Sequence, residues 1–246
     1  MPLCRVLSKM GFASRTVGRS LVKAGRVTVD GQLAENADAP VDPILQRVAV
    51  DGKPLGPQRR VVLAMNKPEG VLTTFHDPQG RPTVYGLLPK MPGWVFPVGR
   101  LDAKSTGLLI FTNDPRLGEI LTNHRYGIPK TYEVKARGTV SDEAVQKLRD
   151  GVMLDDGLKT LPARVRVVKH NPGTTWLEIV LTEGRNRQVR RMLEAVGHKV
   201  DQLRRVRIGG VDLGMLEAGK IRFLSDAEIR LLRSRSNPLA VQDADS

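Results

Sequence analysis

Short apolar runs separated by turn residues constrain the fold of this chain more than any other feature. Helical patterns fall between the runs without a regular strand–helix–strand repeat, which favours an α+β fold with a mainly antiparallel sheet. The expected strands of this sheet are residues 61–65, 107–112, 131–136, 163–168 and 174–181.

Helices are expected after residues that favour the N-cap position in this part of the chain. Asp114 and Ser141 each precede a helical pattern, and a basic helix is expected over residues 186–197. Ser225 with Glu228 has the spacing of a capping box before the last helix.

The N-terminal residues have the pattern of a separate module. Apolar residues repeat with the period of a helix over residues 3–10, and a second helix is expected over 15–24. Asp-Gly pairs at 30–31 and 51–52 each follow alternating residues, which is a strong hairpin signal.

Composition sets the domain boundaries. Residues 53–60 carry two prolines and a glycine and predict a linker. We therefore expect the N-terminal module with its linker at 1–58 and a larger domain at 61–234. Residues 235–246 are small, polar and acidic, which predicts a disordered tail.

The charge of the chain points to a polyanionic partner. Lysine and arginine number 39 against 26 aspartates and glutamates, a net charge of +13. Arg15, Arg19 and Lys23 form a stripe along the second helix, and Arg26 follows it. Such a stripe is often a solvated face. Here no acid interleaves on the helix, so the charges repel unless a polyanion lies across them.

Several kinds of site are not supported by the sequence. The single cysteine, Cys4, excludes an intramolecular disulfide, and the four histidines fit no metal-ligand spacing. No dinucleotide-binding glycine motif, long apolar span or signal peptide is present. We therefore expect a cytoplasmic monomer that uses neither metal nor cofactor.

Asp102 is the first candidate for chemistry. It lies in a loop between Arg100 and Lys104, just before the expected strand 107–112. The neighbouring cations favour its carboxylate, which would be available as a nucleophile at neutral pH. Taken alone, a loop aspartate more often accepts hydrogen bonds from loop backbone, so its spacing leaves both roles open.

The second candidate is the start of the basic helix. Arg185, Arg187, Arg190 and Arg191 lie within seven residues. Cations at a helix N-terminus form a site for phosphate or carboxylate, and a solvated basic helix is the alternative.

Two stretches of the N-terminal module form a signature: Gly-Phe-Ala-Ser-Arg at 11–15 and Leu-Val-Lys-Ala-Gly-Arg-Val-Thr-Val-Asp-Gly at 21–31. On these residues, the module resembles the S4 RNA-binding domain over most of residues 1–50. The resemblance implies that four residues contact phosphates and position the RNA: Arg15, Arg19, Lys23 and Arg26.

The larger domain contains four motifs: Asn-Lys-Pro-Glu-Gly at 66–70, Gly-Arg-Leu-Asp at 99–102, Lys-Thr-Tyr at 130–132 and Glu-Gly-Arg-Asn-Arg-Gln-Val-Arg-Arg-Met at 183–192. In these motifs and their order, the domain resembles the ribosomal pseudouridine synthases of the RsuA type. Together with the S4 module, the resemblance covers residues from about 3 to 233.

This resemblance implies an isomerisation of uridine that needs no cofactor. The N1–C1′ bond breaks, the uracil turns, and it is rejoined through C5. By resemblance, Asp102 is the catalytic nucleophile, Arg190 ion-pairs with it, and Tyr132 packs on the flipped uracil and takes the C5 proton. Taken alone, Tyr132 would be read as a core residue, and only its motif assigns it to the active site.

The resemblance also implies further RNA contacts and a substrate. Arg100 would occupy the space that the flipped base leaves, and the other implied contacts are Lys130, Arg185 and Arg187. Residues 77–84 and the pair Asn186-Arg187 resemble the branch that modifies 23S rather than 16S ribosomal RNA.

Three alternatives remain. The chain could modify 16S RNA, or it could be a non-catalytic S4-type assembly factor, although such a factor could lose Asp102, Tyr132 and Arg190, which this chain retains. A structural ribosomal protein would have long basic tails, whereas the tail here is acidic.

Overall fold

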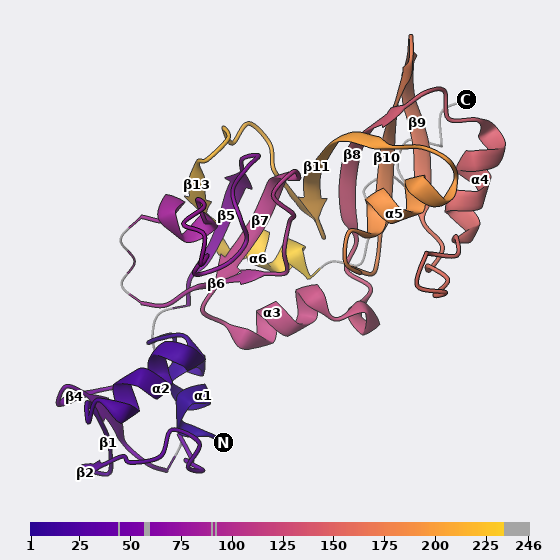
Figure 1. Ribbon diagram of the computed structural model, residues 1–246. Helices are drawn as coiled ribbons and strands as arrows, with labels where there is room; N and C mark the ends of the chain where they lie inside the picture. The colour runs from indigo at the N-terminus through magenta and orange to yellow at the C-terminus, as the bar shows by residue number, and fades with distance from the viewer. Residues whose placement is uncertain (44, 57–59, 90, 92, 234–246) are drawn as a thin grey trace. The chain divides into compact units, whose positions relative to one another are not determined.

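The computed structural model describes residues 1–43, 45–56, 60–89, 91 and 93–233 (Figure 1). The chain forms two compact units, of which the first contains residues 1–62, 89–96 and 111–116. The sequence predicted a single boundary near residue 60. The structure groups the two later segments with the first unit instead. The predicted tail, 235–246, lies outside the described residues.

The N-terminal unit contains two helices and a small antiparallel sheet. Its elements are α1 (Leu3–Lys9), α2 (Arg15–Lys23), β1 (Val27–Val29), β2 (Gln32–Leu33), β3 (Val48–Val50) and β4 (Lys53–Pro54). Among the described residues, the strand order is β2-β1-β3-β4. The Asp-Gly pairs at 30–31 and 51–52 have positive φ at both positions, as type I′ turns require, so both predicted hairpins are confirmed.

The predicted linker is wrong at its start. Lys53 and Pro54 pair with β3 as the return strand of the second hairpin. Pro54 is tolerated because β4 is an edge strand, where a missing N–H removes no ladder bond. Residues 57–59 of the predicted linker lie outside the described residues.

The larger sheet confirms the predicted α+β fold. Its strands are β5 (Val62–Lys67), β6 (Phe96–Val98), β7 (Thr106–Thr112), β8 (Lys130–Arg137), β9 (Arg164–Asn171), β10 (Thr174–Leu181), β11 (Val200–Ile208), β12 (Val211–Asp212) and β13 (Ile221–Phe223). Within the described residues, the order is β13-β5-β7-β11-β8-β10-β9, with β12 on β11 and β6 on β7. Antiparallel pairs predominate, and β7 and β11 form a parallel pair.

Helices lie between the strands as the capping residues predict. They are α3 (Pro115–Thr122), α4 (Asp142–Asp150), α5 (Gln188–Ala195) and α6 (Asp226–Leu232), with 3-10 turns η1 (Val84–Leu87) and η2 (His124–Tyr126). Ser141 caps α4, and Ser225 and Glu228 form the predicted capping box of α6. Helix α4 contacts β9 and α5 contacts β11 (Figure 1).

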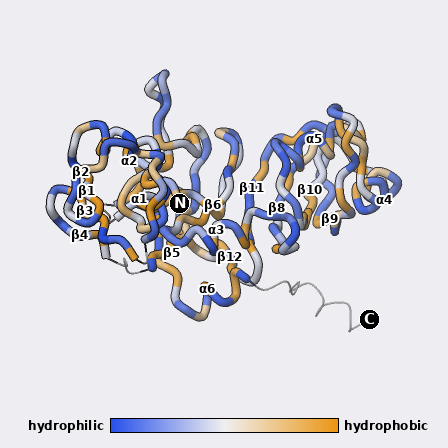
Figure 2. The backbone as a smooth tube through the Cα atoms, turned by 90° about the horizontal axis from the view of Figure 1, so that it is seen from below, coloured by the Kyte–Doolittle hydropathy of each residue, from blue (hydrophilic) through white to orange (hydrophobic). Residues whose placement is uncertain are grey.

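The core beneath these two helices follows from alternation along the strands. Figure 2 shows short hydrophobic and hydrophilic stretches alternating in β8, β9 and β10. The inward residues of these strands, such as Val134, Val165 and Ile179, are buried together with Leu148 of α4 and Leu193 of α5. This core fixes the start of β8, which carries the motif at 130–132. It also fixes the end of β10 and the start of α5, between which the motif at 183–192 begins.

Strand β11 was not expected from the sequence. Its residues Val-Asp-Gln-Leu-Arg-Arg-Val-Arg-Ile include four charges. Its pairing with β8 is interrupted by register shifts at 200–202 and 205–207. Such bulges break the two-residue period by which a strand is recognised in a sequence.

Gly107 brings β7 against β11 at the point where Arg205 lies opposite. Its φ is +100°, and a Cβ atom there would lie 2.2 Å from the carbonyl oxygen of Arg205. Only glycine fits this position, so the loop that precedes β7 and the middle of β11 are held side by side.

We expect Gly107→Ala to lower the free energy of unfolding by about 3 kcal/mol or more, because strained backbone and a backbone clash add. Gly157→Ala is the matched control. Gly157 also has positive φ, +75°, but nothing lies within 4 Å of its added Cβ. The control should therefore lose only about 1–2 kcal/mol. Chemical denaturation of both variants measures the difference, and equal losses would contradict the close approach.

Candidate active site

A cavity of about 380 Å³ lies beside Asp102 in the larger unit. Residues of three predicted motifs line it, together with α3, β10 and β11. Its apolar walls are Leu121, Leu181, Val189, Leu203 and Ile208. Its polar and charged lining includes Arg100, Asp102, Ser105, Lys130, Tyr132, Arg185, Arg187 and Arg205. The fold thus gathers at one cavity the predicted residues Asp102, Tyr132, Arg100, Lys130, Arg185 and Arg187.

Lys67 is a buried cation that holds the backbone near Asp102. Its side chain is fully buried, and its Nζ donates hydrogen bonds to the carbonyls of Ser105 at 2.8 Å and Pro68 at 2.9 Å. Burial lowers the pKa of Lys67 to about 8, and the negative charge of Asp102 partly opposes this shift. The sequence placed Lys67 in a motif without a role, although a lysine ending an apolar strand is itself a signal.

Arg190 holds the same loop from another side. Its side chain is buried, and its guanidinium donates to the carbonyls of Val200 at 3.0 Å and Lys104 at 3.1 Å. Burial and the charge of Arg187 lower the pKa of Arg190, while Asp102 opposes the shift. The structure contains no ion pair between Arg190 and Asp102, both of which it describes, so the predicted contact is absent here. Arg190 instead positions the loop through its backbone.

The carboxylate of Asp102 is left without a partner. The residue is half-buried, and its side chain makes no hydrogen bond or ion pair within the described chain. Thr73 Oγ1 donates to the carbonyl of Leu101 at 2.7 Å, and the amide of Ser105 donates to the carbonyl of Asp102 at 3.0 Å. The loop is therefore fixed by its backbone. Asp102 does not take the structural role that its position alone made plausible.

Strand β8 places two motif residues in the cavity. Tyr132 and Lys130 are two positions apart, so their side chains share one face of the sheet, and both are buried. The Nζ of Lys130 donates to the carbonyl of Ile128 at 3.1 Å. Burial, with a smaller effect from the charge of Arg205, lowers the pKa of Lys130 to about 8.

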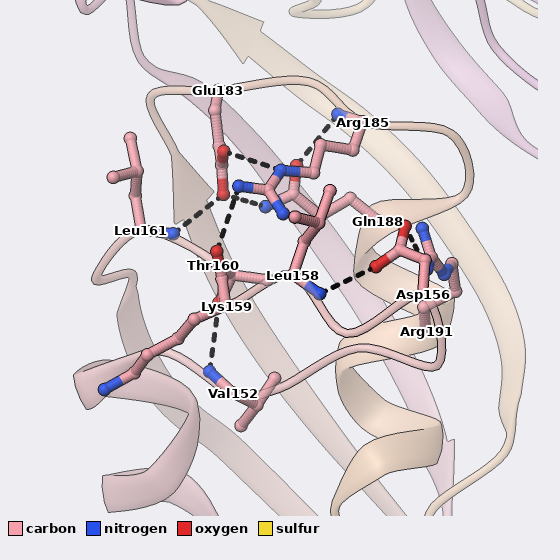
Figure 3. A network of polar contacts seen from close by, with 10 residues as sticks. All are labelled: Val152, Asp156, Leu158, Lys159, Thr160, Leu161, Glu183, Arg185, Gln188 and Arg191. Atoms are coloured by element: carbon pink, nitrogen blue, oxygen red, sulfur yellow. Dashed lines mark hydrogen bonds and ion pairs between the residues drawn. The ribbon is translucent and has the colours of Figure 1, made fainter.

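The loop before α5 is tied to the segment 152–161, which connects α4 with β9 (Figure 3). The buried Glu183 accepts hydrogen bonds from the amide of Leu161 at 2.9 Å and from Gln188 Nε2 at 2.5 Å. Arg185 donates to Glu183 at 3.1 Å and to the carbonyl of Lys159 at 2.9 Å.

Three of the four arginines predicted to form an anion site also contact protein groups in this structure. Arg185 and Arg190 bind protein groups as described, and Arg191 pairs with Asp155 and with Asp156, the latter at 2.7 Å. Arg187 precedes α5 with φ of 49°; it is exposed and, among the residues described, has no partner. Asp155, which pairs with Arg191, lies 36 residues earlier in the chain, where local pattern gives no indication of contact.

The basic stripe of α2 contains two ion pairs that the sequence did not predict. Arg19 binds Asp38 through two hydrogen bonds of 2.6 and 2.8 Å, and Arg26 binds Asp51 through two of 2.5 and 2.8 Å. No acid lies on the helix itself, but these two come from neighbouring loops. Arg15 and Lys23 are exposed and have no such partner within the described chain.

Two kinds of feature are absent from the part of the chain that the structure describes. No helix there is long and apolar enough to cross a membrane. No group of three or more histidine, cysteine, aspartate or glutamate side chains lies in a position to hold a metal ion.

Comparisons with known proteins agree on the family. Residues 61–195 match the family described as RNA pseudouridylate synthase, and residues 1–43 match the S4 domain. An RNA pseudouridine synthase of Aquifex aeolicus (strain VF5) is 40% identical over 229 residues, which are 93% of this chain and 92% of that protein. The ribosomal large subunit pseudouridine synthase B of Escherichia coli (strain K12) is 41% identical over 222 residues, 86% of this chain and 74% of that protein.

A solved structure described as a pseudouridylate synthase has a TM-score of 0.69 and 25% sequence identity. The match covers 94% of this chain and 99% of that one.

We expect Lys67 to lose its proton near pH 8 in the folded protein. The unfolded value is about 10.4, so between these pH values the unfolded chain binds more protons. The free energy of unfolding then rises with pH in this window, by up to about 1.4 kcal/mol per unit from this group. NMR of lysine 13Cε nuclei should show a resonance titrating near pH 8 that Lys67→Met removes, and urea unfolding between pH 7.5 and 9.5 should show a smaller rise in that variant. Titration of Lys67 near 10.4 would contradict the burial argument.

Proposed function

Because the chain belongs to the RNA pseudouridylate synthase family, in its RsuA-type branch with an S4 domain, we propose that it isomerises a uridine of 23S ribosomal RNA in the cytoplasm. The chain is a pseudouridine synthase and hence an isomerase. The observation that carries the residue assignments is the free carboxylate of Asp102 beside a cavity with apolar walls. The 23S substrate is supported by the large-subunit name of the Escherichia coli relative.

In this proposal, Asp102 acts on the sugar of the target nucleotide. The N1–C1′ bond breaks, the uracil turns, and C5 forms the new bond to C1′. The proton on C5 is then removed while N1 gains one, so no oxidant, reductant or water is consumed. Tyr132, which lines the same cavity, packs on the uracil and takes the C5 proton. No cofactor enters these steps, and we propose that the chain acts as a monomer.

Lys67 and Arg190 support the reaction through the loop. They donate hydrogen bonds to the carbonyls of Ser105 and Lys104, the residues that follow Asp102 in the loop. The loop backbone is thereby held while the carboxylate of Asp102 stays free of an ion pair. Such preorganisation lowers the reorganisation that the reaction needs.

The RNA contacts divide according to what the side chains already bind. Arg100 and Arg187 are exposed at the cavity, so we assign them to the flipped nucleotide and its phosphates, with Arg100 in the space that the base leaves. Arg185 is committed to Glu183, and we assign it to shaping the loop. On the S4 domain, Arg15 and Lys23 are the stronger candidates for phosphate contacts.

The first test is to map pseudouridines in ribosomal RNA from cells that lack the gene. We expect one 23S site to be missing, to be restored by the wild-type gene, and not to be restored by Asp102→Asn. The variant should still bind the RNA, because basic side chains supply most of the affinity. Asp201→Asn, which changes a surface acid paired with Arg137, is the control and should restore the site.

The outcomes separate the alternatives. A missing site in 16S RNA would contradict the 23S assignment and support the other branch. A growth or assembly defect that Asp102→Asn corrects, with every pseudouridine present throughout, would support a non-catalytic assembly factor.

The S4 assignment can be tested by salt dependence. We expect Arg15→Gln with Lys23→Gln to weaken RNA binding and to reduce the slope of log affinity against log salt by about 1.5, since two phosphate contacts are lost. Arg19→Gln with Arg26→Gln is the matched pair, and its effect should be smaller because both arginines are bound to aspartates. Equal effects of the two pairs would show that the ion pairs open in the complex.

A further inference from the structure

Two buried cations in the cavity have no anionic partner. Arg205 is only 4% exposed; its Nε donates to the carbonyl of Leu108 at 2.7 Å, and its buried Nη2 has no partner within the described chain. Lys130 is 8% exposed and donates one hydrogen bond, to the carbonyl of Ile128. No carboxylate among the described residues forms an ion pair with either side chain.

The sheet places both cations beside Tyr132. Arg205 of β11 lies opposite Tyr132 of β8 in the antiparallel ladder, and Lys130 precedes Tyr132 by two residues. Opposite residues in such a ladder, and residues two apart on a strand, project from the same face. All three side chains accordingly line the cavity.

Buried charges without partners are expensive, and they are found where a ligand supplies the partner. Arginine and lysine carry hydrogen-bond donors and no acceptor, so the ligand atoms that complete this site are acceptors. A phosphate fits the exposed Arg100 and Arg187 better, because it can remain hydrated there. The buried pair lies among Leu121, Leu203 and Ile208, whose apolar surfaces suit a flat base.

We propose that Arg205, together with Lys130, binds the carbonyl oxygens of the flipped uracil and rejects cytosine. The proposal rests on the proposed function, since a uridine must enter this cavity. Uracil presents the acceptors O2 and O4, whereas cytosine carries an amine in place of O4. The hydrogens of that amine would face donors only, which leaves buried polar groups unpaired. The resemblance gave Lys130 an RNA contact and gave Arg205 none.

A buried hydroxyl that lines the same cavity agrees with this assignment. The hydroxyl of Ser105 is buried in the cavity and makes no hydrogen bond within the described chain. A hydroxyl can accept a hydrogen bond, and uracil offers the N3–H donor between its two carbonyls. Two donor-only cations and one hydroxyl therefore match the acceptor–donor–acceptor edge of uracil.

The test uses the full chain and an RNA stem-loop that contains the uridine located by mapping, with a second stem-loop carrying cytidine there. Binding is measured in the Asp102→Asn background, so that neither RNA is converted. We expect this protein to prefer the uridine stem-loop and Arg205→Met to bring the ratio of the two affinities close to one. In the active chain, Arg205→Met should lower kcat/KM by about 10- to 100-fold.

Arg204→Met is the matched control. Arg204 is the neighbouring residue on β11, exposed and paired with Glu133, and its loss should change neither the affinity ratio nor kcat/KM. Arg205 also bonds the carbonyl of Leu108, so Arg205→Met could fail for structural reasons. Lys130→Met leaves that bond intact and should lower the affinity ratio in the same direction.

Two results would overturn the inference: loss of activity in both variants with an unchanged preference for uridine, or kcat/KM within about twofold of wild type in Arg205→Met. A wild-type chain that converts no uridine in any RNA would overturn the proposed function along with it, and the wild-type reaction distinguishes that failure.

Discussion

Hydrogen bonds from two buried cations to main-chain carbonyls determine the geometry of the candidate active site. Lys67 and Arg190 donate to the carbonyls of Ser105 and Lys104, which lie just after Asp102 in the chain. A buried ammonium or guanidinium is costly in isolation, and these carbonyl dipoles offset part of that cost. The arrangement fixes a loop without using the side chain that the loop presents. The backbone at Asp102 is therefore held while its carboxylate remains unpaired.

Local signals in the sequence predicted those elements that local interactions determine. The Asp-Gly turns, the cap at Ser141 and the box at Ser225 depend on residues at most a few positions apart, and the structure contains each of them. The motif around Asp102 was also recognisable, because its residues are contiguous. Lys67 was visible in the sequence as part of a motif. Its role became apparent only in the fold, where its ammonium binds the loop that carries Asp102.

Contacts between residues that lie far apart in the sequence could not be predicted from local patterns. The pairing of Arg191 with Asp155 and of Arg19 with Asp38 joins segments whose proximity depends on the whole fold. Strand β11 was not predicted because its bulges break the two-residue period. The position of Arg205 was therefore not predicted either. The number of positive residues consequently does not show which of them form the RNA-binding surface. Many of its arginines hold the protein together, and the unpaired cations are the ones available to a ligand.

The parallel pair of β7 and β11 has an evolutionary consequence. Gly107 and Arg205 are registered in one ladder, and the loop of Asp102 leads directly into β7. The spacing between Asp102, the proposed nucleophile, and β11, the strand proposed to bind the base, is therefore set by main-chain dimensions rather than by side-chain rotamers. Inserting one residue into β11 before Arg205 would turn its guanidinium to the opposite face of the sheet. Changes in chain length are accordingly tolerable in connecting loops and intolerable within the paired part of β7 and β11. There, even one added residue would move Arg205 away from the side of the sheet that Asp102 faces.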